Sequence, residues 1–225
     1  MDADVTPGNQ LLEAFLRLDD AARASARVRD EFVARYGFAI PTADVLQRIC
    51  DASPRGIVEL GAGTGYWARL LERLGTTVRA YDIAPPPSRD NPWFASSEPW
   101  HKVRLGNEDV VDDAPPAALL LVWPTRNETW ATAAAQRYHA AGGTTLVYVG
   151  EGPGGRSGDD TFHAVLGEIT SCVHCTYGVK TVPCVCGITP LWHRVAEHQI
   201  PTWSGYHDTV RLYQPRQDED DSWPR

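Results

Sequence analysis

Apolar residues recur at helical spacing near the start of the chain. The spacing predicts two N-terminal helices with a break near residues 19–20. It rests on apolar side chains at positions 11, 12, 15, 16, 18, 28, 32 and 33. Thr42 can cap a further helix that runs through residue 50. We therefore expect residues 1–52 to form an N-terminal helical segment.

Short apolar runs alternate with helical stretches over the rest of the chain. Runs that predict strands lie at 57–60, 77–83, 103–106, 117–122, 144–149, 192–199 and 208–214. Stretches that predict helices lie at 68–74, 129–141 and 159–169. The run 117–122 is apolar throughout, as in a strand buried on both faces of a parallel sheet. The alternation indicates a doubly wound α/β domain over 53–215, followed by a flexible tail at 216–225.

The end of the first predicted strand carries the main chemical signal. Glu59 is followed by Gly61, Gly63 and Gly65, and then by a predicted helix. Glycine permits positive φ and close approach of a ligand, and a helix N-terminus offers unpaired N–H groups. Asp82 ends the next strand, where an acid can accept hydrogen bonds from both hydroxyls of a ribose. The pattern therefore predicts a nucleotide site.

The sixth position of the glycine pattern excludes a dinucleotide. That fingerprint needs glycines at the first, third and sixth positions, and Tyr66 stands sixth from Gly61. The spacing E-x-G-x-G-x-G instead resembles motif I of class I S-adenosylmethionine-dependent methyltransferases, and the resemblance covers residues 40–215. It implies a seven-stranded, mostly parallel sheet with an antiparallel last strand, and S-adenosylmethionine as cofactor.

The resemblance also implies roles for single residues. Glu59 and the turn at 61–65 would meet the methionine portion, and Asp82 the ribose; a cap or turn acid is the alternative for Asp82. Asn107 would read the adenine amino group, or else belong to a solvated turn, and Ile83 would pack on the adenine ring. The full predicted cofactor set is Glu59, Gly61, Ala62, Gly63, Gly65, Tyr66, Asp82, Ile83, Asn107 and Trp123.

The segment after the fourth predicted strand departs from one branch of that family. Amino-group methyltransferases often carry Asn/Asp-Pro-Pro-Tyr/Phe there, whereas this chain has Trp123-Pro124-Thr125. N-methylation of that kind is therefore not expected. Trp123 is interpreted as a pocket wall beside the reactive methyl group, with plain core packing as the equal alternative.

Removal of a proton from the acceptor would require a general base. Glu151, at the end of the fifth strand, is the first candidate, and His207 beside Asp208 is the second; His163 is a further one. Each has a structural alternative. Glu151 can cap the glycine-rich loop that follows it, and His207 with Asp208 can simply turn the chain between two strands.

Four cysteines cluster within fifteen residues before the last two predicted strands. They are Cys172, Cys175, Cys184 and Cys186. The C-x2-C and C-x-C spacing suits tetrahedral Zn²⁺, with His174 and His193 as substitute ligands. We expect a structural, zinc-knuckle-like insertion at 170–190; unligated thiols or a redox pair are the alternatives. Cys50 falls inside a predicted helix and is expected to be a small buried hydrophobe.

The composition mainly argues against certain classes of protein. The 225 residues suit one domain with a substantial core. A net charge of −8 without a basic run disfavours a nucleic-acid partner. No apolar run has the length of a membrane span, and the first ten residues lack the features of a secretion signal, so we expect a cytoplasmic protein with reduced cysteines. Eight tryptophans favour aromatic-lined pockets.

The sequence therefore favours an S-adenosylmethionine-dependent methyltransferase that acts on a small molecule. Lys102 and Lys180 are the two lysines. This composition is typical of a high-GC genome, and it alone suggests bacterial secondary metabolism. The alternative is a non-catalytic protein of the same fold that docks a partner through its cysteine knuckle. A non-methylating reaction, such as a cyclisation, also remains open.

Overall fold

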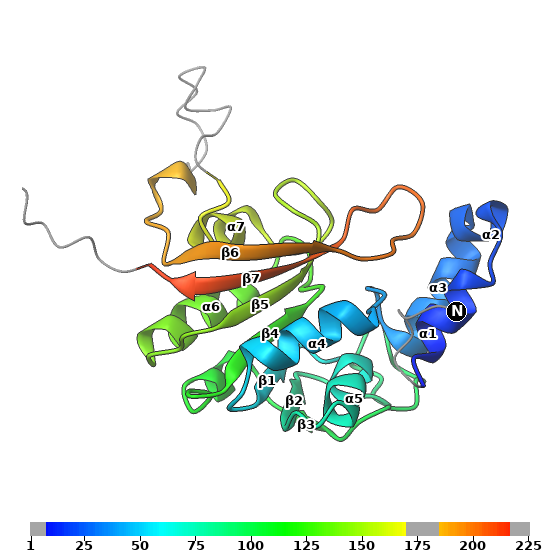
Figure 1. The fold of residues 1–225 in the computed structure, drawn as a ribbon, viewed down its shortest axis with the longest axis horizontal. Helices are drawn as coiled ribbons and strands as arrows, with labels where there is room; N and C mark the ends of the chain where they lie inside the picture. Colours follow the sequence, from blue (N-terminus) through cyan, green and yellow to red (C-terminus); the bar gives the residue numbers. More distant parts are fainter. Residues whose placement is uncertain (1–7, 170–184, 217–225) are drawn as a thin grey trace, which may run out of the picture.

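A seven-stranded sheet forms the centre of the molecule (Figure 1). This computed structural model describes residues 8–169 and 185–216. The strands are β1 (Ile57–Leu60), β2 (Val78–Asp82), β3 (Val103–Leu105), β4 (Ala118–Val122), β5 (Leu146–Gly150), β6 (Trp192–Gln199) and β7 (Thr209–Pro215). Their order is β3-β2-β1-β4-β5-β7-β6. β7 is antiparallel to both of its neighbours, and the other pairs are parallel. The predicted doubly wound, seven-stranded sheet with an antiparallel last strand is confirmed.

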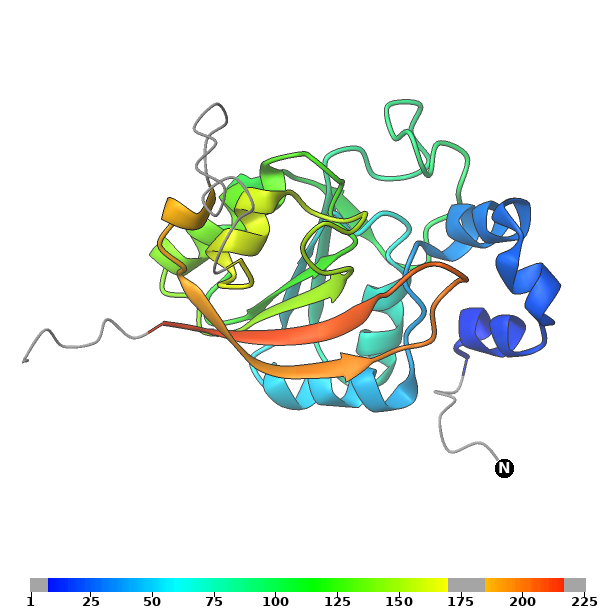
Figure 2. The ribbon, with the colours of Figure 1, turned by 90° about the horizontal axis from the view of Figure 1, so that it is seen from above.

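Two cores form on opposite faces because neighbouring strand residues point to opposite sides. Ile57 packs into one core, whereas Val58 packs into the other. Figure 2 shows one pair of helices on each side of the sheet. The first pair is α4 (Ala43–Ala52) and α5 (Tyr66–Arg73), and the second is α6 (Trp130–Ala140) and α7 (Asp160–Val165). Strands buried on both faces explain why β4 and β5 read as continuous apolar runs.

Three short helices precede the sheet, where the spacing predicted two. They are α1 (Gln10–Leu16), α2 (Asp20–Ala24) and α3 (Ala26–Tyr36). The predicted break is real, because the Asp19 carboxylate accepts a hydrogen bond from the Ala22 amide and starts a new helix. Phe15 and Phe32 meet the indole of Trp203, from the β6–β7 connection, edge to face. The N-terminal helices therefore lie beside the β6–β7 connection, and their apolar residues belong to the same core as Ile57 (Figure 2).

Most predicted elements are observed with shifts of one or two residues at their ends. The helix predicted at 159–169 is shorter, since α7 ends at Val165 and Gly167 follows with a φ of +75°. The Thr42 cap is confirmed, because its hydroxyl accepts from the Val45 amide. Two 3₁₀ turns, η1 (Glu108–Val111) and η2 (Val185–Gly187), complete the described elements.

The predicted zinc ligands Cys172, Cys175 and Cys184 lie outside the described residues, as does the tail from 217. Cys186 falls within η2. Over residues 8–169 and 185–216, no group of three or more His, Cys, Asp or Glu side chains could hold a metal ion. The zinc knuckle therefore stays a prediction. In the same described ranges, no helix combines the length and apolarity that crossing a membrane requires.

Candidate active site

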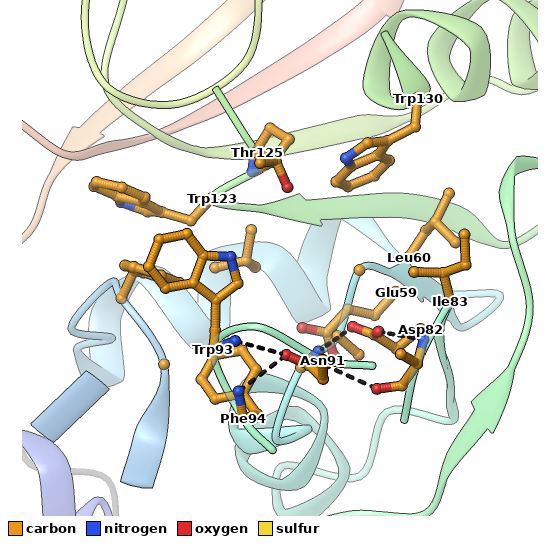
Figure 3. Close-up of a pocket in the computed structure, with 18 of the residues that line it drawn as sticks. Glu59, Leu60, Asp82, Ile83, Asn91, Trp93, Phe94, Trp123, Thr125 and Trp130 are labelled. Carbon is orange, nitrogen blue, oxygen red and sulfur yellow. Dashed lines mark hydrogen bonds between the residues drawn. The ribbon is translucent and has the colours of Figure 1, made fainter. Parts of the chain in front are cut away.

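A cavity of about 880 Å³ lies where β1, β2 and β4 end (Figure 3). Most of the predicted cofactor residues line it: Glu59, Gly61, Ala62, Gly63, Tyr66, Asp82, Ile83, Asn107 and Trp123. Gly65 does not line it and instead caps α5 with a φ of +71°. Ligands bind at this edge of open α/β sheets, where the strand order reverses. Here the reversal falls between β1 and β4.

The glycine turn tolerates no side chain at two positions. Gly61 and Gly63 have φ values of +70° and +51°, a region that glycine enters without cost. A Cβ at Gly63 would overlap the ring of Phe94, and a Cβ at Gly61 would overlap the indole of Trp130. Two aromatic rings therefore pack directly on the bare backbone of the turn.

Asp82 fixes this turn and also faces the cavity. One carboxylate oxygen accepts from the Gly63 amide at 2.9 Å, and the other accepts from the Ala84 amide at 2.9 Å. The side chain is buried, yet it lines the cavity. A carboxylate has about four acceptor sites, so two remain for a ligand. The turn-acid interpretation and the ligand interpretation are therefore compatible.

Glu59 is a buried acid with one unpaired carboxyl oxygen. Its Oε2 atom accepts no hydrogen bond from any residue that the structure describes. Burial raises the pKa of Glu59 to about 8, the Ala68 amide opposes the rise, and the charge of Asp82 adds to it. An unpaired buried carboxylate is costly, and a cationic ligand group would remove that cost. The residue is thus suited to bind an ammonium group.

Tyr66 explains why the sixth position of the motif is not glycine. Its hydroxyl donates to Asn9 Oδ1 at 3.0 Å and accepts from the Leu11 amide at 3.0 Å. Its ring meets Tyr36 edge to face. Burial raises the pKa of Tyr66 to about 12, so the hydroxyl stays protonated. The residue ties the start of α1 to the glycine turn.

The two predicted adenine contacts differ in whether their side chains are available to a ligand. Ile83 is 75% exposed beside Asp82 and lines the cavity, so its side chain is accessible to a ligand. Asn107 is already engaged, since its Oδ1 caps η1 and its amide group donates to the Asp109 carboxylate. Its position favours the structural alternative over adenine recognition by the side chain.

Aromatic side chains form the other end of the cavity. Phe38 stacks on Trp123 with ring centroids 4.7 Å apart and planes 7° apart. Trp93 meets Phe38 edge to face at 5.3 Å, and Tyr206 lies 5.9 Å from Trp123. Figure 3 shows the Trp93 and Trp123 indoles together, on the other side of the cavity from Asp82. We call Phe38, Trp93, Trp123 and Tyr206 the aromatic end.

Trp123 is held in a strained backbone conformation. Its φ of +51° is uncommon for a residue with a bulky side chain. Its indole N–H donates to Asp208 Oδ1 at 2.7 Å, and Phe38 covers its face. Burial raises the pKa of Asp208 to about 7. Strain that the surroundings maintain is typical of functional sites, and it supports the pocket-wall interpretation of Trp123.

Both predicted bases lie outside the cavity lining. The Glu151 carboxylate accepts from the main-chain amides of Arg156 and His207 at 2.7 and 2.9 Å. The His207 side chain is exposed. His163, the further candidate, lies on α7 and pairs with Glu168 at 2.8 Å. These positions favour the structural alternative for Glu151 and do not support either residue as a base.

Sequence reasoning missed Arg29, Phe38 and Tyr206, which also line the cavity. No local motif marks them, because they come from α3, from the segment after it and from the β6–β7 connection. The high tryptophan count was a signal for Trp93, but it did not indicate which tryptophans would meet.

No protein-family model and no curated protein matches the chain. Among solved structures, the 23S rRNA methyltransferase ErmE shares 16% identity over 80% of this chain and 70% of that one, with a TM-score of 0.43. A protein in the NADB-Rossmann superfamily from Streptococcus agalactiae shares 10% identity over 80% and 71%, with a TM-score of 0.42. The CcbJ methyltransferase from Streptomyces caelestis shares 12% over 77% and 94%, with a TM-score of 0.38. Likeness at this level supports no conclusion about activity or acceptor.

Proposed function

We propose that the protein is an S-adenosylmethionine-dependent methyltransferase that acts on a small molecule. The observation that carries the proposal is the unpaired, buried Oε2 of Glu59 beside the glycine turn. The amino-acid end of the cofactor has an ammonium group that matches this carboxylate. A pyrophosphate ligand would place negative charge there and would be repelled.

The rest of this end fits the nucleoside part. Asp82 keeps free acceptor sites for the two ribose hydroxyls after binding the Gly63 and Ala84 amides. Ile83 and the Trp130 ring offer apolar surface for adenine. We assign these roles to Glu59, the glycine turn, Asp82 and Ile83.

S-adenosylmethionine supplies a methyl group on a sulfonium centre, which is an excellent leaving group. The protein therefore mainly has to align the acceptor atom and exclude water. Trp123 and Phe38 form a rigid apolar wall for this purpose. We propose that the acceptor lies against this wall, and we assign no protein base.

A small acceptor is favoured over nucleic acid by two features. The net charge of −8 opposes a polyanion, and the acceptor end is an aromatic recess rather than an extended basic surface. A place in bacterial secondary metabolism has only the lysine-poor composition as support.

Calorimetric titration with S-adenosylhomocysteine tests the proposal. We expect wild-type protein to bind it with a Kd in the micromolar range, about −8 kcal/mol. Glu59→Gln should bind at least about tenfold more weakly, because the ammonium loses its counter-charge. The matched control is Asp51→Asn, which changes an exposed acid on α4. Folded wild-type protein that fails to bind at about 1 mM would contradict the proposal and favour the partner-docking alternative.

The cysteine cluster is a separate proposal. We propose that Cys172, Cys175, Cys184 and Cys186 hold a structural zinc ion, as their spacing suggests. Metal analysis of the purified protein tests it, with near-stoichiometric zinc as the expected result. A metal-free protein with titratable thiols would contradict it without affecting the proposal for the cavity.

A further inference from the structure

Arg29 places a positive charge against the aromatic end of the cavity. Its guanidinium carbon lies 4.3 Å from the centroid of the Tyr206 ring, 5.6 Å from Phe38 and 5.8 Å from Trp123. These distances are within cation–π range. Arg29 comes from α3, so the N-terminal segment contributes directly to this part of the cavity.

The hydrogen-bonding capacity of Arg29 is largely unused. Its side chain is 14% exposed, and Nη1 donates to Asp30 at 3.2 Å. Nε has no partner among the residues that the structure describes. A guanidinium has five N–H donors, and a buried donor that is left unpaired destabilises the fold. Asp30 is 72% exposed, so this ion pair is mostly solvated.

A second arginine at this end is already satisfied. Arg156 packs 4.4 Å from the Tyr206 centroid, donates to Gly205 O at 2.6 Å and pairs with Glu151. Of these two arginines, Arg29 is therefore the one with donors to spare. Glu59 and Asp82 stand at one end of the cavity, whereas Arg29 and Arg156 stand at the other, where Asp208 binds the Trp123 indole.

We infer that the aromatic end binds a flat aromatic acceptor with an anionic group, and that Arg29 is the counter-ion of that group. The inference rests on the proposed function, because it names the acceptor class of the same site. Ring faces of Trp123, Phe38 and Trp93 supply apolar surface for a planar molecule. A guanidinium pairs best with a carboxylate, which it can bind through two N–H groups. Ligand cavities span roughly 300–1,000 Å³, so one of about 880 Å³ has room for a second molecule beside the cofactor.

The test compares 2-naphthoate with its neutral isostere 2-naphthamide. Both are titrated into the full chain, with and without saturating S-adenosylhomocysteine, and binding is measured by calorimetry. We expect wild-type protein to prefer the carboxylate by about tenfold, the gain expected of one charge-assisted pair. Arg29→Gln should abolish the preference, and Arg29→Lys should restore part of it because the charge is kept.

Arg27→Gln is the matched control on the same helix. Arg27 is 89% exposed and pairs with Glu31, so its loss should leave the preference unchanged. Thermal unfolding checks that each variant is folded, and Arg29→Lys serves where Arg29→Gln does not fold. Equal binding of both probes to wild-type protein, or an intact preference in a folded Arg29→Gln, would overturn the inference. Failure of S-adenosylhomocysteine to bind, with the naphthoate preference intact, would instead overturn the proposed function alone.

Discussion

The two ends of the cavity are built in different ways. The acidic end takes Glu59, Gly61, Gly63 and Asp82 from two neighbouring parallel strands and the turn between β1 and α5. The aromatic end takes Arg29, Phe38, Trp93, Trp123 and Tyr206 from five separate segments. The first end is a local motif, whereas the second is an assembly of distant side chains. A cofactor shared by many enzymes can be held by a local motif, and an acceptor specific to one enzyme can be selected by the assembled part.

The largest effect on cofactor binding should come from Asp82, which both holds the glycine turn and is the proposed ribose partner. Asp82→Ala removes the acceptor of the Gly63 and Ala84 amides as well as the proposed ribose partner. We expect S-adenosylhomocysteine binding to weaken by about 100-fold, or about 2.7 kcal/mol. Asp113→Ala is the control, since it removes an exposed acid. Binding within about twofold of wild type would show that the acidic end does not hold the nucleoside.

The next effect should be a pH dependence of cofactor binding. Burial raises the pKa of Glu59 to about 8, so the free protein holds a proton on this residue at neutral pH. An ammonium ligand selects the ionised form. Affinity for S-adenosylhomocysteine should therefore rise as pH increases from 6 to 8, by up to about tenfold per pH unit, with release of a proton. Calorimetry in buffers of different ionisation enthalpy measures the proton.

Glu59→Gln should remove both the proton release and the pH slope. A slope of equal size in this variant would assign the titration to another group and break the link between Glu59 and the ammonium.

A smaller effect, on stability, should follow from loss of the Tyr66 hydroxyl, which ties the N-terminal segment to the start of α5. Tyr66→Phe leaves the Leu11 amide without its acceptor and removes one of two donors to Asn9 Oδ1, which keeps its bond from the Leu12 amide. We expect the free energy of unfolding to fall by about 1–2 kcal/mol, measured in urea, with faster amide exchange in α1. Tyr81→Phe is the control, because it removes a hydroxyl with no hydrogen bond among the described residues. Unchanged exchange in α1 would contradict this role.

The smallest effect should be confined to the aromatic end. Asp208→Ala removes the acceptor of the Trp123 indole N–H and should weaken 2-naphthoate binding by about threefold to tenfold. S-adenosylhomocysteine binding should not change, and Asp208→Asn should retain most of the naphthoate affinity through its amide oxygen. Equal losses for both ligands would mean that the two ends are not separate.

Asp208 also predicts a pH dependence of stability. Burial raises its pKa from 3.8 to about 7, so the folded protein binds a proton that the unfolded chain has lost between these values. Stability from this group is complete below pH 4 and is lost as pH rises to about 7. Asp208→Asn should flatten that part of the profile, which denaturant unfolding across the pH range measures.

Sequence patterns predicted the sheet well because buried strands consist of consecutive apolar residues, which are visible in the sequence itself. β4 and β5 are buried on both faces and read as apolar runs, and the turn after Glu59 required glycines at φ values that other residues avoid. The pattern was weaker for the N-terminal helices. Ser25 ends α2 and caps α3, and so divides the second predicted helix into two short ones, which periodicity alone does not register.

The candidate bases show what local reasoning leaves open. Glu151 ends a strand at the expected edge, but the Arg156 and His207 amides turn its carboxylate into a structural acceptor. Asn107 likewise caps η1. The position of a residue along a strand shows whether it lies at the ligand-binding edge of the sheet. Hydrogen bonds to neighbouring segments decide whether its polar side chain faces a ligand or supports the fold.

By itself the sequence determined the fold class and the acidic end of the cavity, because those residues are close in the chain and are constrained by backbone geometry and strand burial. Only the tertiary structure decided the aromatic end. It joined Arg29 to Tyr206 across 177 positions of the chain, stacked Phe38 on Trp123, and left Arg29 Nε and Glu59 Oε2 without partners. Contacts between distant segments follow from how helices and loops pack on the sheet, and no local spacing encodes them.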